Sequence, residues 1–293
     1  MTWKANPTSA IAQTEKFDQV SLIPDKVDAI FVMGHGTKSE EGRSQFLKAV
    51  ECLRASIKQP VFAGFIELCE PNMYRAMDDL LATNPASIVV APLILLPAGH
   101  LKDDGAELAN YARTKSTQVD VAYSKDLGAH RAILDTIGDR IKDASSNPDT
   151  SVLLAGRGSS DPDANSELFK IARLTKEFGR FAEVEASFIS LALPSVKDGL
   201  DRLYALGSRS IVVQPYFLYR GALLDRIYFQ ANEWAAHHPD CSISLGKEIG
   251  IDESVTQVLI ERIAQASQVP ILMSCDICIY RYPIVGSSKS QIE

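Results

Sequence analysis

The chain has 293 residues, and its 46% hydrophobic and 23% charged residues are typical of a globular protein. This length is enough to bury two hydrophobic cores. The formal net charge of −7 argues against a nucleic-acid partner, because phosphates require a net basic face. No apolar run approaches the roughly 20 residues that span a bilayer, which argues against a membrane protein.

The N-terminus and the cysteine content indicate a cytoplasmic protein. Residues 1–27 carry scattered charges and no apolar core segment, so they do not resemble a secretory signal. Five cysteines are a low, odd count, which fits a reducing compartment and not a disulfide framework. We therefore expect an N-terminal extension over 1–27 and a cytoplasmic location.

Short apolar runs alternate with helical patterns along the first half. Residues 29–33 are continuously apolar and end in a glycine turn, which is typical of a buried parallel strand. Hydrophobic residues at helical spacing follow over about 44–57. The next expected elements are a strand over 61–65, a helix that begins near Pro71, a strand over 88–95, a helix over 108–114 and a strand over 119–123.

The second half is a copy of the first. FIELCEP at 65–71 reappears as FISLALP at 188–194, and SIVVAP at 87–92 reappears as SIVVQP at 210–215. Both pairs have the same offset of 123 residues (188 minus 65 and 210 minus 87), so the chain contains a duplication. The predicted segments are repeats over 28–143 and 150–268, a polar linker between them, and a C-terminal tail over 269–293. Strands are expected in the second repeat over 152–154, 184–188, 211–218 and 242–245.

This order predicts an α/β fold of two tandem domains, each a parallel sheet flanked by helices, with the active-site cleft between them. Ligands of such sheets bind beyond the carboxyl ends of the strands. His35 follows the first strand, Glu67 ends the second, and His100 follows the third. We therefore expect these three side chains at one rim. The second copy replaces them by Arg157, Ser190 and Leu223.

Two imidazoles and a carboxylate suit transient binding of a divalent metal, or removal of protons from ring nitrogens. Purely structural histidines, and a solvated carboxylate at Glu67, remain the alternatives. A histidine phosphatase is disfavoured because Gly34, and not a phosphate-clamping arginine, precedes His35. No glycine-rich nucleotide-binding motif opens a helix.

Three motifs resemble the class II chelatases of the CbiX and SirB type: VMGHGT at 32–37, FIELCEP at 65–71 and PLILLPAGH at 92–100. The resemblance covers nearly all of residues 28–283. It implies ATP-independent insertion of a divalent metal into sirohydrochlorin, with His35 and His100 as the metal-handling, catalytic pair and Glu67 as the acidic residue.

The resemblance leaves the metal open. Cobalt would serve cobalamin synthesis and iron would serve sirohaem synthesis, and we favour cobalt because duplicated members with a Cys-x-x-Cys tail resemble cobaltochelatases. A carrier that binds metal or tetrapyrrole without turnover is the rival interpretation.

Sirohydrochlorin is rich in carboxylates, so an acidic chain must supply local cations to bind it. The candidates are Arg157, Lys38 and Arg220; further basic residues are Lys102, which follows His100, and Arg226, near the third strand of the second repeat. The alternative for each is a solvated surface charge.

Cys275 and Cys278 form a Cys-x-x-Cys pair near the C-terminus. The resemblance implies that this pair binds an iron–sulfur cluster. Two thiolates cannot complete a four-cysteine shell, so a cluster would require a homodimer joined through the tail, or other ligands. An empty tail, a zinc site and a disulfide remain alternatives.

Overall fold

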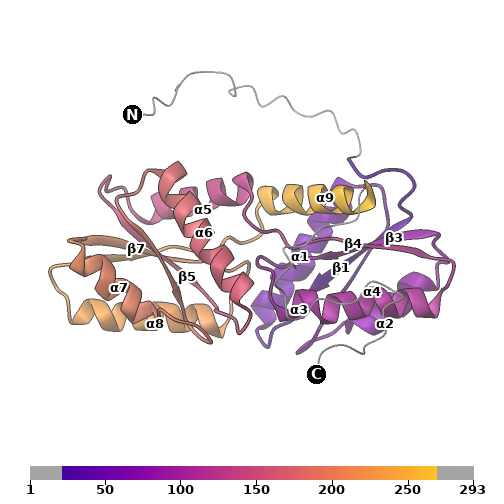
Figure 1. Cartoon of the computed structure of the whole chain (residues 1–293), viewed down its shortest axis with the longest axis horizontal. Helices are drawn as coiled ribbons and strands as arrows, with labels where there is room; N and C mark the ends of the chain where they lie inside the picture. Colours follow the sequence, from indigo (N-terminus) through magenta and orange to yellow (C-terminus); the bar gives the residue numbers. More distant parts are fainter. Residues whose placement is uncertain (1–21, 269–293) are drawn as a thin grey trace, which may run out of the picture.

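The computed structural model describes residues 22–268. It contains two α/β halves that lie side by side, each built on a four-stranded parallel sheet (Figure 1). This arrangement confirms the predicted fold class. None of the helices in residues 22–268 is long and apolar enough to cross a membrane.

The first sheet has the strand order β2-β1-β3-β4, and β1 at its centre is buried along its whole length. Its strands are β1 (Ala29–Gly34), β2 (Val61–Phe65), β3 (Ser87–Pro92) and β4 (Asp120–Tyr123). The helices between them are α1 (Glu40–Ser56), α2 (Met73–Leu81), α3 (Gly99–Lys102) and α4 (Asp104–Lys115).

The second sheet has the equivalent order β6-β5-β7-β8. Its strands are β5 (Ser151–Gly156), β6 (Val184–Phe188), β7 (Ser210–Pro215) and β8 (Ser242–Leu245). Its intervening helices are α6 (Pro162–Gly179), α7 (Val196–Ala205) and α8 (Ala222–Ala236). The shared order shows that the duplicated sequence folds the same way twice.

The predicted third strand of each repeat, 88–95 and 211–218, extends beyond the observed one. β3 and β7 end at Pro92 and Pro215, although apolar residues continue beyond them. In the first half the Leu93 N–H still donates to the carbonyl of Met33 in β1, and Leu95 lies beyond the strand; both side chains are buried in the core. The hydrophobicity of Leu95 therefore reflects burial in a loop and not strand pairing.

The last helix of each repeat packs on the other half. Helix α5 (Arg131–Ala144) contacts β7 and α6, whereas α9 (Glu253–Gln268) contacts α1 and β3 (Figure 1). Equivalent hydrogen bonds fix both helices. Arg140 on α5 donates to the carbonyl of Ile249 at 3.1 Å, and Arg262 on α9 donates to that of Leu127 at 2.7 Å. The two halves are therefore interlocked.

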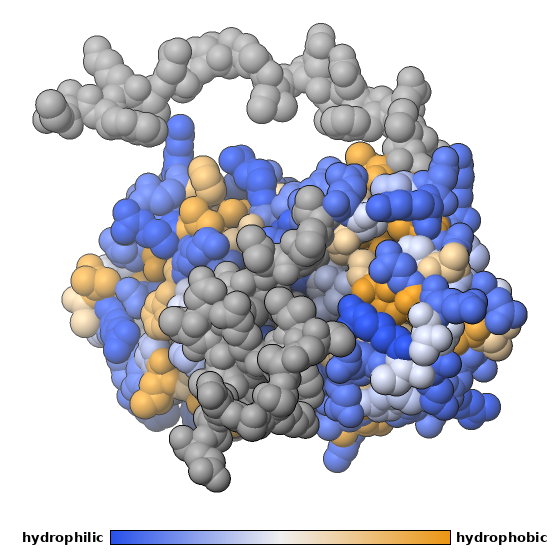
Figure 2. Space-filling model, turned by 45° about the vertical axis from the view of Figure 1, so that its right-hand side comes forward, coloured by the Kyte–Doolittle hydropathy of each residue, from blue (hydrophilic) through white to orange (hydrophobic). Residues whose placement is uncertain are grey.

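The hydrophobic core reflects this exchange. One continuous apolar cluster contains residues of β1, β5, α5 and α9, so it spans both halves. Each sheet also has a smaller apolar cluster on its opposite face. The face seen in Figure 2 is mostly hydrophilic with separated apolar patches.

Strand register brings the loops of the site together. Gly34 of β1 is paired with Phe65 of β2, and Met33 is paired with Pro92 of β3, so the three carboxyl ends lie at one edge. Gly36 follows with a φ of +99°, and a Cβ there would overlap the carbonyl oxygen of Glu67. A glycine is required at this position because the two loops touch.

Candidate active site

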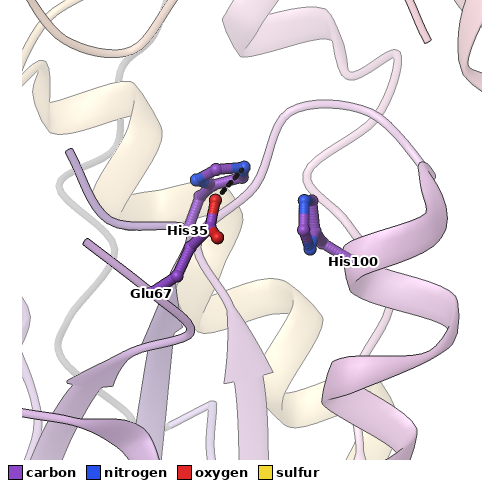
Figure 3. A group of neighbouring side chains, drawn as sticks. All are labelled: His35, Glu67 and His100. Atoms are coloured by element: carbon purple, nitrogen blue, oxygen red, sulfur yellow. Dashed lines mark ion pairs between the residues drawn. The ribbon is translucent and has the colours of Figure 1, made fainter.

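The structure brings His35, Glu67 and His100 together at the carboxyl edge of the first sheet (Figure 3). One potential ligand atom from each residue lies within 4.8 Å of the others. His35 Nε2 is 3.8 Å from Glu67 Oε1, and the centroids of the two imidazole rings are 4.4 Å apart. These distances suit three ligands of a single metal ion. The strand-end argument thus predicted this convergence.

These three side chains come from different parts of the first half. His35 directly follows β1, as expected, whereas Glu67 lies in the loop two residues beyond β2. His100 belongs to the short helix α3 and not to the loop before it. Glu67 is exposed and the histidines are half-buried, so the group is open to an incoming ion.

Hydrogen bonds select which nitrogen each histidine presents. His35 Nδ1 lies 3.2 Å from the carbonyl oxygen of Gly36, which can only accept, so Nδ1 carries the proton. His100 Nδ1 lies 2.8 Å from Asp104 Oδ2, which likewise assigns its proton to Nδ1. Each Nε2 atom therefore carries the lone pair that a metal would bind, and the partners fix the ring orientations.

The environment keeps His35 neutral. Burial lowers its pKa, and the nearby His100 and Arg157 lower it further, against smaller opposing effects of Gly36 and Glu67. A neutral imidazole is the form that binds metal. His35 is therefore a competent ligand at neutral pH.

The second half contributes Arg157, which occupies the position after β5 that His35 occupies after β1. Its Nη1 atom lies 2.9 Å from His35 Nε2. The carboxyl ends of the two sheets thus face each other, with the histidines on one side and an exposed guanidinium on the other.

The other predicted cations differ in their environments. Lys38 is exposed beside the His35 loop. Arg220 follows β7, where its guanidinium pairs with Asp225 at 3.0 Å and its backbone N–H donates to Gln45. Both remain candidates for binding an acidic ligand.

Lys102 was a wrong candidate for contact with substrate. Its side chain is only 3% exposed, and Nζ pairs with Asp161 at 2.8 Å and Asp163 at 2.7 Å. Lys102 therefore joins α3 to the start of α6, across the boundary between the halves.

Asp104 is the site residue that the sequence analysis missed. It lies four residues after His100, a spacing that places two side chains near one another on helical backbone. That spacing was the available signal. A change from α3 to α4 intervenes, so the contact depends on the bend between them.

The predicted cluster site, Cys275 and Cys278, lies outside the described residues. The iron–sulfur cluster and the homodimer through the tail therefore remain predictions. The three cysteines within residues 22–268, Cys52, Cys69 and Cys241, are free thiols.

Comparison with known proteins agrees with the duplication. The family model described as CbiX matches the chain twice, at residues 29–144 and 151–266. A sirohydrochlorin cobaltochelatase of Priestia megaterium is 32% identical over 264 residues, which cover 88% of this chain and 86% of the relative. A sirohydrochlorin ferrochelatase of the same organism is 32% identical over 206 residues, covering 69% of this chain and 77% of the relative.

The fold is also similar to a solved structure, SirB from Bacillus subtilis with Fe³⁺, at a TM-score of 0.74 and 27% identity. That similarity covers 83% of this chain and 96% of the solved one. The two matches to the family model include both sheets and all three motifs of the site. The chain therefore belongs to the CbiX family, as a member with two repeats.

Proposed function

We propose that this protein is an ATP-independent chelatase that inserts a divalent metal, with Co²⁺ favoured, into sirohydrochlorin for cobalamin synthesis in the cytoplasm. The observation that carries the proposal is the group of His35, Glu67 and His100, with Arg157 facing it from the other half. The names of the relatives support the reaction and its substrate.

The three side chains suit an ion that must be released. His35 and His100 would hold the metal substrate through Nε2, and the Glu67 carboxylate would complete a set of three ligands. The coordination positions that the protein does not fill would be open to water or to the macrocycle nitrogens. A site with only three protein ligands, one of them exposed, favours transfer of the ion over storage.

Metal insertion must also remove two protons from the ring nitrogens. A histidine that holds the metal through Nε2 has no second free nitrogen, since Nδ1 already carries a proton. As the ion passes to the macrocycle, each Nε2 regains its lone pair and can take up one proton. His35 and His100 therefore exchange a metal ion for two protons, and Glu67 assists as a nearby acceptor.

The second half would bind the carboxylates of the substrate. Arg157 is the first candidate because it faces the histidines, and Lys38 and Arg220 would add charge at the sides. A guanidinium can bind a carboxylate through two parallel hydrogen bonds. The macrocycle would thus lie between the two halves.

Iron is the second candidate metal, because relatives named as ferrochelatases match the chain as well. Imidazole and carboxylate ligands bind both ions, and cellular supply decides which one is loaded. Nothing in this set of ligands distinguishes cobalt from iron.

The test is anaerobic conversion of sirohydrochlorin, followed by absorbance, with Co²⁺ or Fe²⁺ supplied separately. Wild type should exceed the spontaneous rate, and His35→Ala and His100→Ala should abolish this excess. His237→Ala is the matched control, because within residues 22–268 the side chain of that exposed histidine bonds only to the Glu233 carbonyl of its own helix. Binding of the tetrapyrrole without any gain in rate would contradict the chelatase and favour a carrier.

A further inference from the structure

Arg157 and a metal ion would compete for one nitrogen of His35. Arg157 Nη1 lies 2.9 Å from His35 Nε2, and a guanidinium can only donate, so Nε2 is the acceptor. The other ring nitrogen, Nδ1, faces the carbonyl oxygen of Gly36. Nε2 is therefore the nitrogen left for a metal, and Arg157 already uses its lone pair.

The imidazole is a weak partner for Arg157. It accepts a single bond from the exposed guanidinium and carries no charge in its neutral form. A carboxylate would accept two parallel bonds from the guanidinium and would also supply the opposite charge. An incoming carboxylate will therefore draw Arg157 away from His35.

We propose, on the basis of the function proposed above, that Arg157 is a gate that couples binding of an acidic tetrapyrrole to metal capture at His35. Without substrate, Arg157 occupies Nε2 and its positive charge repels a divalent cation. A substrate carboxylate moves Arg157 away and frees Nε2 beside Glu67 and His100. Because linkage is reciprocal, each ligand then tightens binding of the other.

Competition between Arg157 and the metal is tested with Co²⁺ alone. The ion is titrated anaerobically and its binding is followed by its d–d absorbance. Arg157→Met keeps an unbranched stem but donates no hydrogen bond, so it should bind Co²⁺ about 5- to 50-fold more tightly than wild type. Lys197→Met removes the same charge from an exposed site on α7 and should leave the Kd unchanged. Equal or weaker Co²⁺ binding by Arg157→Met would overturn the gate.

A double-mutant cycle separates the gate from general charge repulsion. In a His35→Ala background the contested nitrogen is gone and only charge repulsion remains, so adding Arg157→Met should improve the Co²⁺ Kd less than it does in the wild-type background. An equal gain in both backgrounds would show that Arg157 acts only through its charge, and the gate would be wrong.

Binding of the substrate carboxylate by Arg157 is tested by steady-state kinetics with sirohydrochlorin. Arg157→Met should raise the KM for sirohydrochlorin, so that affinity for metal and affinity for substrate change in opposite directions. An unchanged KM would overturn the coupling. If wild type gives no insertion above the spontaneous rate, the chelatase proposal fails, while the Co²⁺ titrations still decide whether Arg157 competes for His35.

Discussion

Lys102 and Asp161 form an ion pair at 2.8 Å across the boundary between the halves, with side chains only 3% and 4% exposed. Asp163 accepts from the same ammonium at 2.7 Å. The lysine lies on α3, the helix that carries His100, and the carboxylates lie at the start of α6. This pair therefore connects the position of His100 to the second half.

Replacement of Lys102 by methionine should destabilise the protein by about 3–5 kcal/mol, because the buried carboxylate of Asp161 and the partly buried one of Asp163 lose their compensating charge. Urea denaturation at pH 7.5 measures the effect. Lys142→Met, at a side chain that is 66% exposed, is the control and should have little effect. An unchanged midpoint for Lys102→Met would show that water or neighbouring groups compensate the carboxylates.

Loss of the Asp104 carboxylate should weaken metal binding. Asp104→Asn removes the charged acceptor that fixes the proton and the ring of His100, so the Co²⁺ Kd should rise about 10- to 100-fold. Anaerobic Co²⁺ titration measures it. Glu107→Gln, an exposed carboxylate on the same helix, should leave the Kd unchanged. Equal affinities for both variants would rule out an orienting role for Asp104.

Asp126 should make stability depend on pH. Burial raises its pKa from 3.8 to about 6, against the lowering effects of Lys125 and Arg262, while Glu167 raises it further. Between about pH 4 and 6, Asp126 is therefore protonated in the folded state and ionised in the unfolded state. The resulting loss in the free energy of unfolding is absent below this window, grows as pH rises through it, and is complete above it.

Asp126→Asn should remove this cost, which two pKa units put at about 3 kcal/mol. Chemical denaturation at pH 4 and pH 8 gives the comparison. We expect equal stabilities at pH 4 and a more stable variant at pH 8. A constant difference at both pH values would show that Asp126 does not titrate in this window.

Gly36 should tolerate no side chain. In Gly36→Ala the new methyl group would overlap the Glu67 carbonyl, and the φ of +99° disfavours alanine as well. We expect loss of both Co²⁺ binding and insertion, since the loops of His35 and Glu67 must separate. Gly138→Ala is the control, because an added Cβ there would have no atom of residues 22–268 within 4 Å apart from its own stretch of helix, and alanine favours helix α5 by about 1 kcal/mol. Normal Co²⁺ binding by Gly36→Ala would contradict this account.

The sequence predicted the elements of the site better than its contacts. The strands that precede His35, Glu67 and His100 could be located from apolar runs, and parallel topology then placed their carboxyl ends at one edge. The partners Asp104 and Asp161 could not be found in this way, because their contacts depend on how α3 is oriented and on the fit of the two halves. A buried lysine such as Lys102 has the same sequence pattern as an exposed one.

The exchange of α5 and α9 could not be predicted for a different reason. In a duplicated chain both helices have an apolar face that fits either sheet, so the hydrophobic pattern is the same with and without exchange. Only the path of the chain after β4 and β8 decides which half each helix joins.

This exchange means that neither half is complete when it is cut from the chain. Proteolysis between α5 and β5 would break the only covalent connection within residues 22–268, yet Arg140 and Arg262 would still bind each half to the helix of the other. We expect the nicked fragments to co-elute in size-exclusion chromatography. A single repeat expressed alone would have to recruit a second copy to cover the surface left by its missing helix.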